Sequence, residues 1–188
     1  AQGGGPMREP SPCCACGALG AEARCPRCGA ARVAGAYVVE ALVATGSRGR
    51  VYRARSGAGE VVALKEIIFT RTPTAETLRA YEREAEVLRA LEHPGIPRLV
   101  DCFSDGEGAG LRWYLAQQLA EGVPLSTALQ QRRFTEAEVL ELGLRVLGIL
   151  EYLQAQRPPV VHRDVKPANI VVRGDGAVKL VDFGAARA

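Results

Sequence analysis

The sequence predicts an α+β protein in which an antiparallel sheet is followed by helices, with a small cysteine-rich module before the sheet. Three observations predict this order. Five of the six cysteines lie between residues 13 and 28. Three runs rich in β-branched residues follow one another from Tyr37 onward. Two segments with helix-start signals come after them.

Composition narrows the class of protein. The chain has 188 residues, is 47% hydrophobic and carries a net charge of +3 from 24 basic and 21 acidic residues spread along its length. Such a charge pattern does not favour nucleic acid or lipid headgroups as the main partner. No apolar run is long enough to span a membrane and no signal-peptide pattern is present, so we expect a cytoplasmic protein.

Residues 1–12 are rich in Gly, Pro and Ser, and we expect them to be disordered.

The cysteines predict a zinc-ribbon-like module over residues 13–34. Two Cys-x2-Cys pairs separated by eight residues can place four thiolates around one tetrahedral Zn²⁺. Gly17 and Gly29 follow the two pairs, where the chain turns past the metal. Cys14 could replace the first ligand, and surface thiols or disulfides are the alternative to zinc. The four candidate ligands are Cys13, Cys16, Cys25 and Cys28.

The region after the module predicts five strands and one helix. Strands are expected over 37–46, 50–55, 60–69, 97–103 and 112–119. The helix lies between the third and fourth strands, with Thr72 as its expected cap and Pro73 in its first turn. A lone His93 follows this helix, and we expect it to serve packing and not metal binding.

A second long helix begins at a capping box formed by Thr135 and Glu138. It is apolar on nearly every side, which predicts that it is buried, and it ends before Pro158. Short strands are expected over 159–162, 169–172 and 177–181, the last two joined by the turn "RGDG".

Two glycines and one pair of charged residues are candidate site residues. Gly46 and Gly49 let a hairpin backbone approach a phosphate, although alone they indicate only a turn. Lys65 lies within an apolar strand and needs an anion, which Glu84 on the following helix can supply. The alternative is that Lys65 extends to the surface and Glu84 is solvated.

The segment "HRDVKPAN" carries the strongest signal. Asp164, Lys166 and Asn169 lie within six residues, and Asp182 follows the apolar run "VKLV". A hairpin from Asn169 to Asp182 would bring a carboxylate and an amide oxygen together, which are ligands that Mg²⁺ accepts.

In this order, "GSRGRV", "VALK", the helical Glu84, "HRDVKPAN" and "DFG" resemble a eukaryotic-type serine/threonine protein kinase of the kind found in bacteria. The resemblance covers Tyr37 to the end of the chain. It implies a kinase N-lobe and hinge over residues 37–120, built from a five-stranded antiparallel sheet and an αC helix. A partial helical C-lobe over 121–188 would follow, with the αD and αE helices, the catalytic loop and the DFG motif.

The resemblance also implies catalytic roles. Lys65, paired with Glu84, would hold the ATP phosphates, and Asp164 would accept the proton of a substrate hydroxyl. Lys166 would neutralise charge on the transferred phosphoryl group, and Asn169 and Asp182 would bind Mg²⁺. Lys at the second position after the catalytic Asp is similar to the serine/threonine subgroup.

The nucleotide would be bound mainly by apolar and backbone groups. Ala44 stands in place of the first loop glycine, and Gln118 in place of the usual hinge acid. His162, Phe183 and Leu88 would pack inside the domain. The implied nucleotide-binding residues are Ala44, Gly46, Ser47, Gly49, Val51, Ala63, Lys65, Gln118, Ala120, Asn169, Val171 and Asp182.

We therefore expect an ATP- and Mg²⁺-dependent kinase that acts on protein Ser/Thr hydroxyls, with structural Zn²⁺. No activation segment follows the DFG motif, so we expect the amino-terminal part of a longer protein; a natively truncated chain is the alternative. A pseudokinase or nucleotide-binding scaffold without phosphotransfer is one rival function. A binding role for the cysteine module is another, in which the lack of aromatic residues argues for protein over nucleic acid. The oligomeric state is not predicted.

Overall fold

The computed structural model describes residues 10–46 and 49–183. Two compact units make up the chain, one formed by Ala1–Pro73 and Asp101–Gln117 and the other by Thr74–Val100 and Gln118–Ala188. The first unit holds the cysteine module and most of the main sheet, and the second holds the helices and the carboxy-terminal hairpin. The division into domains at residues 12, 34 and 120 stays a prediction.

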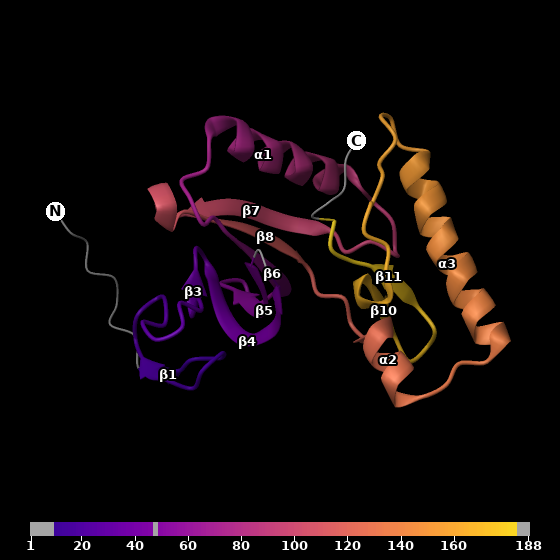
Figure 1. Cartoon of the computed structure of the whole chain (residues 1–188), viewed down its shortest axis with the longest axis horizontal. Coiled ribbons are helices and arrows are strands. Elements are labelled where there is room, and N and C mark those ends of the chain that lie inside the picture. The colour runs from indigo at the N-terminus through magenta and orange to yellow at the C-terminus, as the bar shows by residue number, and fades with distance from the viewer. Residues whose placement is uncertain (1–9, 47–48, 184–188) are drawn as a thin grey trace. The chain divides into compact units, whose positions relative to one another are not determined.

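The main sheet has six strands in the order β3–β4–β5–β6–β8–β7 (Figure 1). Five of them confirm the predicted strands. The sixth, β3, follows the cysteines directly and pairs antiparallel with the start of β4, so the cysteine module continues into the sheet. The strands are β3 (Val33–Ala34), β4 (Tyr37–Gly46), β5 (Gly49–Ser56), β6 (Val61–Ile68), β7 (Leu99–Asp105) and β8 (Arg112–Gln118).

The register of β5 and β6 decides which side chains share a face. Tyr52 lies opposite Leu64, and Arg50 lies opposite Glu66. Tyr52, Leu64 and Glu66 are all fully buried. Since side chains alternate along a strand, Lys65 points to the other face of β6, together with its partner Val51 on β5.

The cysteine module has little regular structure of its own. Strands β1 (Ser11–Pro12) and β2 (Leu19–Gly20) form a two-stranded ribbon around the first cysteine pair. Ser11 and Pro12 fall in the segment expected to be disordered. The buried residues of the module are Cys13, Cys25, Ala30, Ala31, Arg32 and Ala34, which is too small a set for a core without help from a metal or from the sheet.

Helix α1 (Ala75–Ala90) starts two residues later than expected. The expected cap Thr72 is wrong, because Thr74 has the extended backbone of an N-cap and its side chain accepts the N–H of Thr77 at 3.1 Å. The helix buries Ala85 and Leu88.

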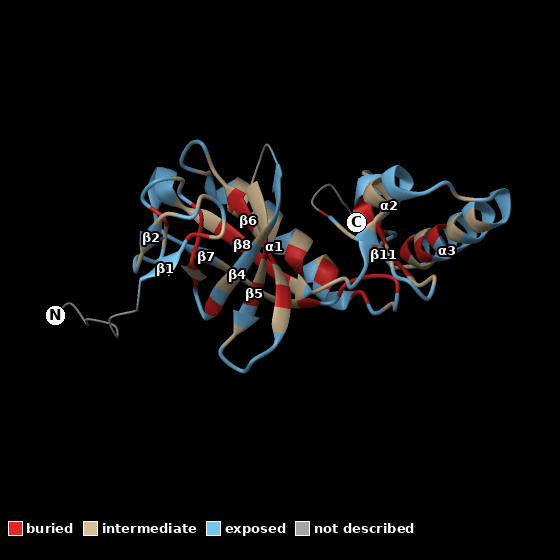
Figure 2. Cartoon of the chain, turned by 90° about the horizontal axis from the view of Figure 1, so that it is seen from below, coloured by how far each residue is buried: buried red, intermediate tan, exposed pale blue. Residues whose placement is uncertain are grey.

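Helix α3 (Glu136–Gln154) confirms the predicted capping box, in which Thr135 and Glu138 satisfy each other's backbone N–H groups. The expectation that the whole helix is buried is wrong for this chain. Only Val146, Ile149 and Leu153 are buried, as the red stripe along α3 in Figure 2 shows. Its exposed large apolar side chains are Val139, Leu140, Leu144 and Leu147.

A small sheet in the order β11–β10–β9 lies in the second unit. Strand β9 (Val123–Pro124) leads into helix α2 (Leu125–Gln131), and β10 (Ile170–Val172) and β11 (Val178–Leu180) form the predicted hairpin. The expected strand over 159–162 is not one of the described strands. Val160 instead donates its N–H to the carbonyl of Leu153 at 2.9 Å, which folds this segment back on the end of α3.

Among the helices of the described ranges, none has the length and apolar character needed to cross a bilayer.

Burial along α3 predicts a sharp difference between two leucines. Leu153 is 0% exposed and Leu144 is 70% exposed. Leu153→Ala should lower the free energy of unfolding by about 2–5 kcal/mol because it leaves a cavity in the core. Leu144→Ala, the matched control on the same helix, should change it by less than about 0.5 kcal/mol. Urea unfolding followed by circular dichroism measures both, and equal losses would contradict the assigned burial.

Candidate functional site

The loop between α3 and β10 gathers three of the predicted site residues. Lys166 Nζ donates to Asp164 Oδ2 at 2.7 Å, and the side-chain amide of Asn169 donates to the same oxygen at 2.9 Å. That amide also donates to the backbone carbonyl of Asp164 at 2.9 Å. The 3-10 turn Pro167–Asn169 holds Asn169 in this position. Since the amide nitrogen of Asn169 is engaged, its carbonyl oxygen is the atom that can bind a cation.

The β10–β11 hairpin brings Asp182 to the same end. The backbone N–H of Val181 donates to the backbone carbonyl of Asn169 at 2.8 Å. Asp182 is the next residue along the chain. Asp182 has φ of 62° and Arg163 has φ of 67°, both in the left-handed region. Non-glycine residues in that region are uncommon and gather at functional sites.

Internal packing fixes the two ends of this loop. His162 and Phe183 are both 2% exposed, and their rings meet edge to face with centroids 4.6 Å apart. His162 Nδ1 accepts the N–H of Asp164 at 3.3 Å, so Nε2 is the nitrogen that donates to the carbonyl of Val181 at 3.1 Å. One buried ring therefore ties the loop before β10 to the segment after β11.

The electrostatics of the loop favour an ionised Asp164. The hydrogen bond from Lys166 holds the pKa of this carboxyl below its ordinary value, and Asn169 adds to the effect. Asp164 is partly exposed, so a substrate group can reach it. The arrangement can accept a proton, neutralise an anion and bind a hard cation.

The predicted phosphate-binding residues lie in the first unit. Lys65 is half-buried on β6, and Gly46 pairs with Gly49 at the end of the β4–β5 hairpin. A Cβ atom on Gly49 would overlap the carbonyl oxygen of Glu66, so sheet packing alone requires a glycine there. Gly46 has room for a side chain, and the sheet does not explain it. Ser47, between them, lies outside the described residues, as does Gly184 of the DFG motif.

Two other predictions concern the second unit. Glu84 lies half-buried on α1, and its pairing with Lys65 stays a prediction. The N–H of Gln118 donates to the carbonyl of Arg98 at 2.8 Å, and its side chain accepts from Lys179 at 3.0 Å. Any backbone contact from residues 117–120 to a base would therefore use groups other than the Gln118 amide. Ala120 is half-buried, while Val171 is buried on β10.

His93 confirms the expected packing role. Its Nδ1 accepts the N–H of Gly95 at 3.0 Å, and its ring lies 4.8 Å from that of Tyr152. Burial lowers the pKa of His93, which favours the neutral ring.

The four predicted cysteines form a second candidate site. One ligand atom from each lies within 4.8 Å of all the others. Cys13 Sγ is 3.6 Å from Cys28 Sγ, and Cys16 Sγ is 3.6 Å from Cys25 Sγ. Tetrahedral zinc with Zn–S bonds of about 2.3 Å requires sulfur separations of about 3.8 Å, so the set fits this ion.

The two cysteine pairs have the same backbone geometry. Gly17 donates to the carbonyl of Cys13 at 2.9 Å, and Gly29 donates to the carbonyl of Cys25 at 2.8 Å. Both glycines have φ near 70°, at 72° and 70°. Cys14 lies outside the group of four, and all six cysteines are free thiols, which decides against the disulfide alternative in this structure.

Sequence reasoning missed one buried residue, Glu66. It is 0% exposed and follows Lys65 on β6. A signal was present, since Glu66 occupies the apolar face of an alternating strand, where a carboxylate requires donors. Those donors come from residues far away in the sequence, which no local pattern indicates.

Comparisons with known proteins agree with this geometry. Residues 37–188 match the protein kinase domain family. The chain is 35% identical over 153 residues to "Serine/threonine-protein kinase 36" of Pongo abelii, a match that covers 81% of this chain and 11% of the relative. It is 33% identical over 173 residues to "Serine/threonine-protein kinase B" of Synechocystis, covering 87% of this chain and 29% of the relative. It is 34% identical over 166 residues to "Serine/threonine-protein kinase PknA" of Mycobacterium tuberculosis, covering 87% and 38%.

The chain therefore spans well under half the length of these relatives. The match begins at the first residue of β4 and includes five strands of the main sheet, α1, α3, and the loop and hairpin that carry Asp164, Asn169 and Asp182. This chain belongs to the protein kinase domain family.

Proposed function

We propose that the chain carries the catalytic residues of a serine/threonine protein kinase that transfers the γ-phosphoryl group of Mg-ATP to a protein hydroxyl. One observation supports this proposal most strongly. Asp164, Lys166 and Asn169 form a hydrogen-bonded set, and Asp182 lies beside it at one end of the β10–β11 hairpin. Phosphoryl transfer needs positioning and charge neutralisation more than covalent chemistry, and these groups supply both.

Each residue has a distinct role in this proposal. Asp164 orients the substrate hydroxyl and accepts its proton, while Lys166, bonded to Asp164, neutralises charge on the phosphoryl group. The carbonyl oxygen of Asn169 and the carboxylate of Asp182 would hold Mg²⁺, which supplies charge neutralisation at the phosphates. The Ser/Thr assignment rests on Lys166, two residues after Asp164, and on the names of the relatives.

Lys65, paired with Glu84, would bind the α- and β-phosphates, and the Gly46–Gly49 hairpin would cover them. Gly46 supports this role because the sheet does not require a glycine at that position. Val51 and Ala63 share the face of Lys65, where they would contact the adenine. The free cysteines fit a reducing compartment, from which we propose a cytoplasmic location.

Substitutions of three aspartates can distinguish ATP binding from phosphate transfer. Asp182→Ala should abolish Mg²⁺-dependent ATP binding and phosphorylation, because it removes a metal ligand. Asp164→Ala should keep ATP binding and lower phosphate transfer by about 10²–10⁴-fold. Asp175→Ala, in the exposed hairpin turn, is the matched control and should retain both.

Calorimetry with Mg-ATP and transfer of labelled phosphate to a Ser/Thr substrate measure the two steps. Binding without transfer by the wild-type chain would favour a nucleotide-binding scaffold for these residues. Full activity in Asp182→Ala would contradict the proposed magnesium ligand.

We further propose that the four-cysteine group holds one structural Zn²⁺. The sulfur separations of 3.6 Å and the repeated backbone geometry of the two pairs support this assignment. Structural zinc contributes about 10 kcal/mol or more to the folding of small modules, which the few buried residues here cannot supply.

Adjacent cysteines give a matched test. Cys13→Ser should lower bound zinc from one ion per chain to well below one, because it removes a ligand. Cys14→Ser should retain one ion per chain. Elemental analysis of the purified variants measures both, and an equal loss from the two variants, or no zinc in the wild-type chain, would contradict the assignment.

A further inference from the structure

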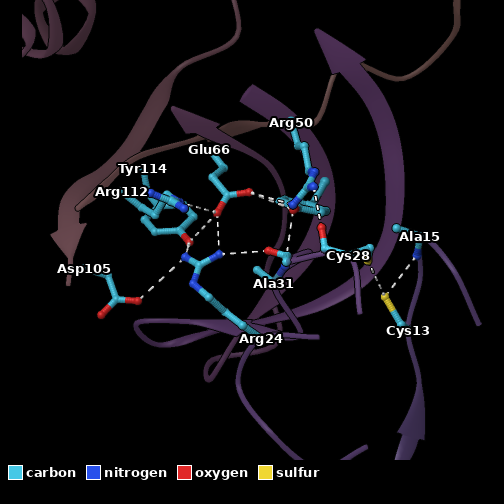
Figure 3. A network of polar contacts seen from close by, with 12 residues as sticks. Cys13, Ala15, Arg24, Cys28, Ala31, Arg50, Glu66, Asp105, Arg112 and Tyr114 are labelled. Carbon is cyan, nitrogen blue, oxygen red and sulfur yellow. Dashed lines mark hydrogen bonds and ion pairs between the residues drawn. The ribbon is translucent and has the colours of Figure 1, made fainter. Parts of the chain in front are cut away.

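The cysteine module contacts the sheet at a buried charge, as Figure 3 shows. Glu66, at 0% exposure, accepts hydrogen bonds from Arg24 of the module at 2.6 Å and from the hydroxyl groups of Tyr52 at 2.8 Å and Tyr114 at 3.1 Å. Arg24 also donates to the hydroxyl of Tyr114. Glu66 is therefore held jointly by the module and by two strands of the sheet.

Arg50 makes a second connection, between the backbone of Cys28 in the module and strand β5. Its Nη2 donates to the carbonyl of Cys28 at 2.7 Å, and its Nη1 lies 3.9 Å from a carboxylate oxygen of Glu66. Arg50 directly follows Gly49 and lies opposite Glu66 in the sheet register. The module also donates the N–H of Ala31 to the hydroxyl of Tyr52 at 3.3 Å.

These contacts lie next to the proposed nucleotide-binding residues. Glu66 is adjacent to Lys65 in β6, and Gly49 packs so closely on the Glu66 backbone that a Cβ atom has no space there. A shift of the Glu66 backbone would therefore displace both Lys65 and Gly49. Loss of Arg24 would remove one donor from the buried carboxylate, and loss of the ordered Cys28 carbonyl would remove the acceptor that holds Arg50 near it.

We propose that metal bound by the cysteine module controls the nucleotide affinity of the kinase domain, with Glu66 and Arg50 as the positioning residues that connect them. With metal bound, the Cys28 backbone and Arg24 are ordered and Glu66 holds β6 in place. Without metal, the module loosens, and Lys65 and Gly49 lose their fixed positions. This inference rests on the proposed ATP-binding function.

Two arginines of β5 allow a matched test in the full chain. Arg50→Met removes the contacts with Cys28 and Glu66 but leaves all cysteines. Arg55→Met removes a similar pair of contacts on the same strand, to the carboxylate of Glu40 at 2.6 Å and the carbonyl of Gly59 at 3.0 Å, away from the module. Both variants should retain one zinc per chain.

Mg-ATP affinity is measured by calorimetry on each protein in two states. One state is zinc-loaded; the other has been stripped of zinc with a zinc-selective chelator, which is then removed by desalting. Arg50→Met with zinc, and the wild type without zinc, should each bind Mg-ATP at least about fivefold more weakly than the zinc-loaded wild type. Arg55→Met should stay within about twofold. Zinc removal should have a smaller effect in Arg50→Met than in the wild type, because the connection is already broken.

Hydrogen exchange of the β6 amides, measured without nucleotide, separates this inference from the proposed function. Zinc removal and Arg50→Met should each speed exchange in Val61–Ile68, and Arg55→Met should not. Faster exchange in a chain that fails to bind Mg-ATP would keep the connection and reject the proposed function. Unchanged exchange in β6 after zinc removal, or equal affinity with and without zinc, would overturn the inference.

Discussion

The first unit depends on one buried anion. The carboxylate of Glu66 is fully buried in the sheet, where Arg24, Tyr52 and Tyr114 donate hydrogen bonds to it. Arg50 at 3.9 Å and Arg112 at 3.8 Å add ion pairs. Burial, together with the charge of Glu66, raises the pKa of Tyr52 to about 12, so its hydroxyl stays protonated as a donor. Removing one partner from such a buried pair costs about 3–5 kcal/mol. The cysteine module thus shares buried polar contacts with the sheet, within one compact unit.

The second unit follows a different constraint, which is local. Asp164, Lys166 and Asn169 are placed by hydrogen bonds within a few residues, and the hairpin register then sets Asp182 next to them. The buried ring of His162 ties the two ends of this arrangement together through Val181. These hydrogen bonds all join residues between His162 and Phe183.

This contrast explains what the sequence could predict. The loop from His162 to Asn169, the hairpin and the Thr135–Glu138 capping box follow from residues close in the chain, and the structure contains all of them. The cap of α1 was placed wrongly because Thr72 and Thr74 offer the same side chain two residues apart, and only backbone geometry distinguishes them. The four cysteines were predicted by their spacing, although Cys14 could be excluded only by the positions of the sulfur atoms.

Long-range features were beyond prediction. Strand β3 is two residues long, and its pairing with β4 depends on where the cysteine module ends. The donors of Glu66 come from residues 24, 52 and 114, and their convergence depends on the fold of the whole unit. The exposed apolar side of α3 was misjudged because hydrophobic composition predicts burial without naming what covers each face.

The most direct test of this account is a double-mutant cycle on the free energy of unfolding with Arg24→Met and Glu66→Gln. If the buried carboxylate joins module and sheet, the two changes should be coupled by about 1–3 kcal/mol, since the second change adds little once the first has broken the pair. Effects that add to within about 0.3–0.5 kcal/mol would show that the module and the sheet are stabilised independently, which contradicts the central claim.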